Sequence, residues 1–170
     1  MAVACQAGRM EAHPKVYLAG PLGFTESGRL YHETVLLPAV VAAGFDPLDP
    51  WDVDAEIAAV FALPVGDARR VELLPAVNRR IGARNAEMIR ECSGVLAVLD
   101  GSDVDSGTAA EIGYAAARGR PVVGLRSDIR TAGDNEAAIV NLQVEWFIEA
   151  SGGRLASTLA DAVSALLALL

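Results

Sequence analysis

Cysteine and histidine are both scarce in this sequence of 170 residues, which contains two of each. Cys5 lies in the opening segment and Cys92 in an expected helix, and neither has neighbours at metal-ligand spacing. Neither histidine has a partner residue that suggests a metal site, and no Ser-His-Asp or Cys-His set is indicated. We therefore expect no disulfide framework, no metal and no cofactor. The cysteine usage is typical of the reduced cytoplasm.

Positive charge and long apolar runs are also in short supply. Lys and Arg total 14 against 22 Asp and Glu, so the formal net charge is −8, which argues against a nucleic-acid partner. No run approaches the roughly 20 apolar residues that span a bilayer, so no membrane partner is expected. A hydrophobic content of 52% with 21% charged residues is typical of a globular protein, and the length suits one domain.

The opening segment, residues 1–14, is expected to be a disordered leader that precedes a single domain over 15–170. Its lone Arg9 follows the mildly apolar part, whereas a secretory signal places positive charge before that part.

Within 15–170, strand-like and helix-like segments alternate. This alternation predicts an α/β fold: a single-domain open parallel sheet with helices on both faces, in a Rossmann-like or flavodoxin-like three-layer sandwich. Strands are expected within 15–21, 45–52, 94–100 and 121–126, and helices within 27–44, 76–92, 106–119, 134–150 and 155–170. Segment 55–75 is interpreted only as a variable insertion near the mouth of the site.

In such sheets, ligands bind beyond the carboxyl ends of the strands. The helix expected over 106–119 starts at that edge and carries one carboxylate, Glu111, among small and apolar residues. Glu111 is either part of a solvated polar stripe with Thr108 and Arg118 or a catalytic group. Asp105 is either the N-cap of this helix or a second site carboxylate.

Two uncharged polar residues point to the same edge. Asn85 shares a helical face with Ile81, Met88 and Cys92, and a buried amide without partners costs about 1–3 kcal/mol. It must therefore bond to protein or to ligand. Tyr17 ends a central strand, where its hydroxyl needs a partner. The sequence contains neither a Walker loop nor GxGxxG, so carboxylates, an amide and a tyrosine suggest chemistry on a sugar or base.

Four segments carry a family resemblance: VYLAGPLGF, ARNAEMIRECSGVLAVLDG, DSGTAAEIGYAAARGRPVV and VNLQVEW. In this order and approximate spacing they resemble the nucleoside 2-deoxyribosyltransferase family, from about residue 15 to 146. The most specific piece is the D-x-G-x-x-x-E-x-G-x-A pattern over 105–115.

The resemblance implies roles for the residues of the motifs. Glu111 matches the family's nucleophile, and Tyr17 matches the tyrosine that orients and activates it. Asp105 and Asn85 match positions that contact and help to protonate the nucleobase, and Phe24 matches an aromatic that stacks on the base. Gly20 and Gly107, within the same motifs, are expected to bind substrate.

The resemblance also implies partners. These are a deoxynucleoside and a nucleobase, together with further copies of the chain in a homodimer or higher homo-oligomer. Asn141 matches an asparagine that a neighbouring subunit donates to the sugar hydroxyls. Gln143 stands where the family often has Met, which makes the expected sugar pocket more polar. The apolar cluster Leu142, Trp146 and Phe147 is expected to drive the assembly.

Three functions remain open at this stage. The first is transfer of 2-deoxyribose between nucleobases through a glutamyl-deoxyribosyl intermediate. The second is hydrolysis of the N-glycosidic bond of deoxynucleosides or their 5′-monophosphates, since Ser106 and Thr108 resemble phosphate-binding hydroxyls of related N-hydrolases. The third is a non-catalytic nucleotide-sensing module, which would have no need of a nucleophile.

Overall fold

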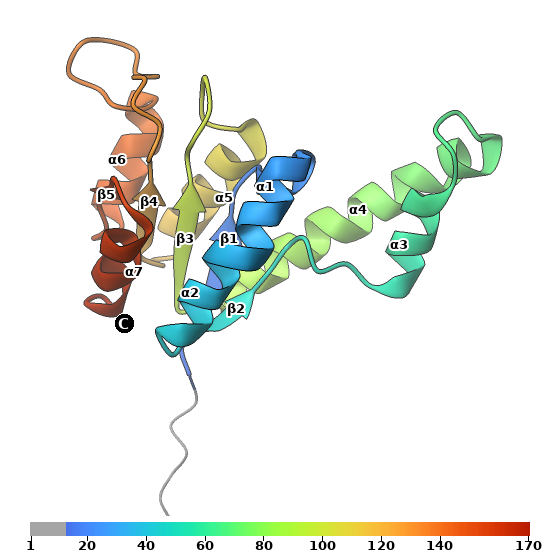
Figure 1. Ribbon diagram of the computed structural model, residues 1–170, viewed down its shortest axis with the longest axis horizontal. Helices are drawn as coiled ribbons and strands as arrows, with labels where there is room; N and C mark the ends of the chain where they lie inside the picture. The colour runs from blue at the N-terminus through green and yellow to red at the C-terminus, as the bar shows by residue number, and fades with distance from the viewer. Residues whose placement is uncertain (1–12) are drawn as a thin grey trace, which may run out of the picture.

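The computed structural model describes residues 13–170 (Figure 1), so nearly all of the expected leader lies outside the described residues. Five strands form one sheet in the order β2-β1-β3-β4-β5, and every neighbouring pair is parallel. The predicted parallel α/β fold is thereby confirmed. The strands are β1 (Lys15–Ala19), β2 (Asp46–Leu48), β3 (Gly94–Val98), β4 (Val122–Leu125) and β5 (Leu155–Ala156).

Helices cover both faces of this sheet, and strand β1 shows how its residues are divided between them. Val16 and Leu18 pack on one face, and Tyr17 and Ala19 on the other, as the alternation of a strand requires. The first face is covered by α1 (Glu26–Tyr31), η2 (His32–Leu36), α2 (Leu37–Ala42) and α7 (Leu159–Leu167). The second is covered by α4 (Ala68–Glu91), α5 (Ser106–Ala117) and α6 (Leu142–Ala150).

The first expected helix is one rod with a π-helical segment, η2, in its middle. Pro38 has no backbone N–H, and its ring would collide with the carbonyl four residues earlier in a regular α-helix. The backbone widens instead, and the N–H of Leu37 donates to the carbonyl of His32, five residues back. The wide turn therefore begins at His32, whose side chain is buried.

Segment 55–75, for which no helix or strand was predicted, is largely helical. It contains α3 (Ala55–Ala62) and the first turns of α4, and together they form a hairpin that projects away from the sheet (Figure 1). Helix α4 starts eight residues earlier than expected, because the Asp67 carboxylate caps the N–H groups of Arg69 and Arg70. Pro75 lies inside this helix, where it removes one helical hydrogen bond without ending the helix.

The two expected C-terminal helices are both shorter than predicted. Residues 134–141 form a loop, and α6 begins only at Leu142, where the Asn141 side chain caps the helix and Asp134 accepts from the Leu142 N–H. At the start of the last segment, Leu155–Ala156 adds strand β5 to the sheet edge, because the carbonyls of Arg154 and Ala156 accept from β4 and its exit.

The last helix, α7, follows β5 and is capped by Thr158. Across residues 13–170, no helix combines the length and the apolarity that a bilayer span requires.

Candidate active site

The centre of the site is a hydrogen-bonded pair at the junction of β1 and α5. Tyr17 points to the α5 side of the sheet and is fully buried, and its hydroxyl donates to Glu111 Oε1 at 2.7 Å. From α4, the Asn85 amide Nδ2 donates to the same oxygen at 3.4 Å. Three residues from three elements, each predicted from the sequence, therefore meet at one carboxylate.

Local sequence explains why Glu111 and Asn85 meet. Helix α5 is built largely of Ala and Gly around Glu111, so α4 can pack close to it. Asn85 lies one turn before the buried Ile89 and one turn after Ile81, on the face of α4 that looks toward α5 and β1. Asn85 Oδ1 is buried and has no hydrogen-bond partner within residues 13–170, so it remains an acceptor for a ligand.

Burial sets the protonation of this group of residues. It raises the pKa of Glu111, while the hydrogen bonds from Tyr17 and Asn85 lower that pKa and the nearby Asp105 charge raises it. Burial and the negative charge of Glu111 raise the pKa of Tyr17, which therefore stays protonated as a donor. Both donors bind Oε1. The other oxygen, Oε2, accepts no hydrogen bond from the described residues and is free to act as a nucleophile.

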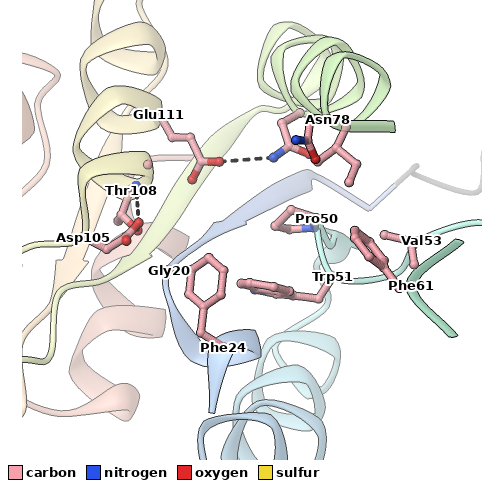
Figure 2. Close-up of a pocket in the computed structure, with 13 residues that line it drawn as sticks. Gly20, Phe24, Pro50, Trp51, Val53, Phe61, Asn78, Asp105, Thr108 and Glu111 are labelled. Atoms are coloured by element: carbon pink, nitrogen blue, oxygen red, sulfur yellow. Dashed lines mark hydrogen bonds between the residues drawn. The ribbon is translucent and has the colours of Figure 1, made fainter. Parts of the chain in front are cut away.

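Asp105 caps α5 and also lies at the cavity. Its Oδ2 atom accepts from the Thr108 N–H at 3.0 Å and from the Thr108 hydroxyl at 3.2 Å, which makes it the N-cap of α5. The same residue lines the cavity that Glu111 lines (Figure 2). One carboxylate oxygen stabilises the helix, and the other is left without a protein partner in the described part of the chain.

These side chains border a cavity of about 360 Å³. Most of the predicted site residues are brought together here, with carboxylates at one end and aromatic rings at the other (Figure 2). The lining residues are Gly20, Phe24, Pro50, Trp51, Val53, Phe61, Asn78, Ile81, Asn85, Asp105, Gly107, Thr108 and Glu111.

Two predicted substrate residues lie elsewhere. Asn141 and Gln143 do not line this cavity in the isolated chain. The Asn141 oxygen caps α6 by accepting from the N–H groups of Gln143 and Val144, and its nitrogen donates to Asp134. Gln143 is exposed on the first turn of that helix.

Several lining residues were not predicted. Trp51 follows β2, at the edge of the sheet where ligands are expected, but no pattern in the sequence indicated where its ring would point. Phe61 on α3 shows that the insertion does reach the site, as expected. Within 13–170, no three His, Cys, Asp or Glu side chains lie close enough together to hold a metal ion.

The arrangement suits a ligand with one polar and one planar apolar part. The carboxylates and the amide can engage a sugar, and Phe24, Trp51 and Phe61 offer ring surfaces to a base. A model of the nucleoside 2-deoxyribosyltransferase family matches residues 16–145. The chain belongs to this family. The matched span contains Tyr17, Glu111 and every other predicted site residue.

Solved structures with the same fold include 2-deoxyribosyltransferases. A conserved protein from Enterococcus faecalis has a TM-score of 0.64 at 24% identity over 94% of this chain and 100% of its own. The 2-desoxiribosyltransferase from Leishmania mexicana has a TM-score of 0.61 at 24% identity over 89% and 95%.

A CMP N-glycosidase from Clostridium botulinum has a TM-score of 0.51 at 19% identity over 92% of this chain and 99% of its own. At these identities the likeness establishes the fold alone. No curated protein matches this member of the deoxyribosyltransferase family at a significant level.

Removal of the Tyr17 hydroxyl should move the pH dependence of this family member. In Tyr17→Phe the hydrogen bond that lowers the pKa of Glu111 is lost, so that pKa rises further. If the ionised form is the active one, the acid limb of the pH–rate profile shifts to higher pH. kcat/KM above the limb should fall roughly tenfold to a hundredfold, the usual effect of one hydrogen bond to a charged group.

The measurement is kcat/KM for deoxynucleoside cleavage across the acid range, with the exposed Tyr31→Phe as the matched control. An unshifted limb in Tyr17→Phe would show that the bond does not set the ionisation of Glu111.

Proposed function

We propose that the protein transfers 2-deoxyribose from a 2′-deoxynucleoside to an acceptor nucleobase. The observation that carries this proposal is that Glu111, hydrogen-bonded by the buried Tyr17, lies at the wall of a cavity that Asp105 and aromatic rings also line. A carboxylate held through one oxygen and free at the other is suited to attack at C1′ of a sugar.

The reaction is a double displacement with net retention. Glu111 Oε2 forms a bond to C1′ as the C1′–N bond breaks, and the departing base takes the electron pair and a proton supplied by Asp105. The sugar is then an ester of Glu111. A nitrogen of the acceptor base attacks C1′, the ester C–O bond breaks, and the proton of the acceptor returns to Asp105.

The charge of the cavity favours an unphosphorylated substrate. Among the described residues its wall has two carboxylates and no Lys or Arg. The nearby Arg84 guanidinium donates to the backbone carbonyls of Asp49 and Asp52. The Thr108 hydroxyl, a candidate phosphate ligand in the hydrolase alternative, donates to Asp105 instead. A deoxynucleoside therefore fits the wall better than its 5′-monophosphate.

One assay tests this function against its alternatives. Deoxyinosine is incubated with and without adenine, in parallel with deoxyinosine 5′-monophosphate, and the products are separated by chromatography. New deoxyadenosine is expected. Hypoxanthine alone would establish hydrolysis, a preference for the monophosphate would overturn the substrate assignment, and no turnover would leave a binding module.

We further propose that a second copy of the chain completes each site. Asn141 does not reach the cavity of its own chain, and beside it Leu142 and Trp146 are 51% and 60% exposed. Phe147 does not belong to this surface, contrary to expectation, because it is half-buried against α5 beside Gly113. The exposed pair offers an apolar surface from which Asn141 can enter a neighbouring site.

Mixing two inactive variants, Glu111→Ala and Asn141→Ala, should then restore activity. After subunit exchange, one site of each mixed dimer receives an intact Glu111 and an intact Asn141, so about a quarter of the wild-type rate is expected for random pairing of dimers. The readout is base exchange, with exchange itself followed by mass spectrometry. A monomer by light scattering, or no recovery despite proven exchange, would exclude completion by a second copy.

A further inference from the structure

The ring of Trp51 lines the cavity, and its position was not predicted from the sequence. It lies in the loop after β2 and is half-buried, with its ring 4.8 Å from that of Phe24 at 87° (Figure 2). Both rings line the cavity, and Phe24 is 69% exposed. The two rings pack edge to face against each other and both border the same space, where they offer aromatic surface to a planar base.

Gly23 makes room for the indole. A Cβ added at Gly23 would lie 2.1 Å from the Trp51 ring, so the ring occupies the place of a side chain at that position. Only glycine allows this close approach. The contact between Gly23 and Trp51 packs the segment after β1, which contains Phe24, against the loop after β2.

A hydrogen bond between the His32 and Asp49 side chains fixes the residue that binds the backbone of Trp51. The Trp51 backbone N–H donates to Asp49 Oδ1 at 2.9 Å, and Asp49 Oδ2 lies 2.8 Å from His32 Nε2. The side chains of His32 and Asp49 are 6% and 13% exposed. The Asp49 backbone is also fixed, because its carbonyl accepts from Arg84 at 3.3 Å. These contacts restrict the conformation of the loop that carries the indole.

The position of His32 follows from the π-helical segment. η2 begins at His32, and the neighbouring Glu33 and Thr34 are exposed while His32 is buried against the sheet. A functional role is common for such wide turns. Here the wide turn places the imidazole behind the loop that carries Trp51.

We propose that Trp51 is a base-binding wall of the cavity and that His32 and Asp49 are positioning residues that hold it. The identity of the ligand as a nucleobase rests on the proposed function. The hydrogen bonds that connect His32 through Asp49 to Trp51 are observed in the structure and do not depend on that function. The two parts can therefore fail separately.

The first experiment measures the fluorescence emission of Trp51 in the full chain. Subtracting the emission of Trp51→Phe from that of each variant isolates the Trp51 signal, since Trp146 is present in all of them. In His32→Leu the Trp51 emission should shift to longer wavelength, because the indole loses its anchor and gains water. His32→Gln, whose amide can still donate to Asp49, should stay near wild type, as should the exposed Glu33→Gln.

Binding and kinetics test the role of this wall. Adenine and cytosine are titrated as probes, and the base that binds should quench Trp51. In His32→Leu its Kd and its KM as acceptor should rise about tenfold, the effect of one lost hydrogen bond to a charged group, while kcat stays within about threefold. His32→Gln should restore both values. If the base quenches Trp51 but no transfer occurs, base binding at Trp51 is supported and only the transferase function is refuted.

Gly23→Ala displaces Trp51 by a second route that leaves His32 intact. The added methyl group collides with the indole, so the same emission shift and the same rise in KM are expected. Gly82→Ala on α4 is the matched control, because an added Cβ there meets no atom within 4 Å. This pair decides the proposal if His32→Leu does not fold.

The positioning role is refuted if His32→Leu folds and leaves Trp51 emission unchanged. The wall itself is refuted if Gly23→Ala shifts the emission without weakening base binding. A fall in kcat with no change in base KM would place the effect at the sugar end and also contradict the proposal.

Discussion

Glu111→Gln should abolish base exchange, with kcat lowered by about 10³-fold or more, because an amide cannot form the ester with C1′. Wild-type protein incubated with a deoxynucleoside and no acceptor should show the mass of one deoxyribosyl group on the peptide that contains Glu111. The exposed Glu33→Gln is the control and should keep wild-type rates. An adduct on another residue would refute the assignment of the nucleophile.

The same variant has an expected effect on stability. Burial raises the pKa of Glu111 in the folded protein above its ordinary value of 4.5. Over the window that starts near 4.5 and extends upward to the raised pKa, the folded state keeps a proton that the unfolded state releases, so stability falls as pH rises. Gln has no such proton. Thermal melts above this window should therefore show Glu111→Gln to be as stable as wild type or more so, and a lower Tm would contradict this.

Asp105→Asn should separate proton donation from helix capping. Asn caps helices about as well as Asp, so the Thr108 N–H keeps its acceptor and the Tm should hardly change. The proton for the departing base is lost, and kcat should fall by about 10²- to 10⁴-fold. Asp105→Ala loses the cap as well and should show both a lower rate and a lower Tm.

A substrate whose leaving group needs no proton tests whether Asp105 acts as a proton donor. A deoxynucleoside whose base is already alkylated and cationic leaves without a proton, so its C1′–N cleavage should be nearly as fast in Asp105→Asn as in wild type. If the variant is equally slow on this substrate, Asp105 does not act by proton donation.

The contact between Tyr17, Glu111 and Asn85 could be predicted from the sequence. β-Alternation fixes the side of the sheet to which Tyr17 points, and helical periodicity fixes the face of Asn85. The parallel topology then brings these residues and the start of α5 to one edge. The core of the site was thus fixed by local rules and topology together.

Other features depend on contacts that no periodicity encodes. The position of Trp51 depends on a missing side chain at Gly23, far away in the sequence. The two-residue strand β5 is too short for a pattern and exists because β4 offers it hydrogen-bonding partners. The late start of α6 depends on Asp134, whose side chain accepts from the Leu142 N–H across a loop.

Arg84 links the two ends of the cavity. Its guanidinium holds the carbonyls of Asp49 and Asp52 in the loop that carries Trp51, and the next residue along α4 is Asn85, which bonds to Glu111. A tilt of α4 would therefore move the aromatic wall and the Asn85 amide in the same direction. The projecting α3–α4 hairpin continues the same helix, so its orientation is coupled to both ends of the cavity through Arg84 and Asn85.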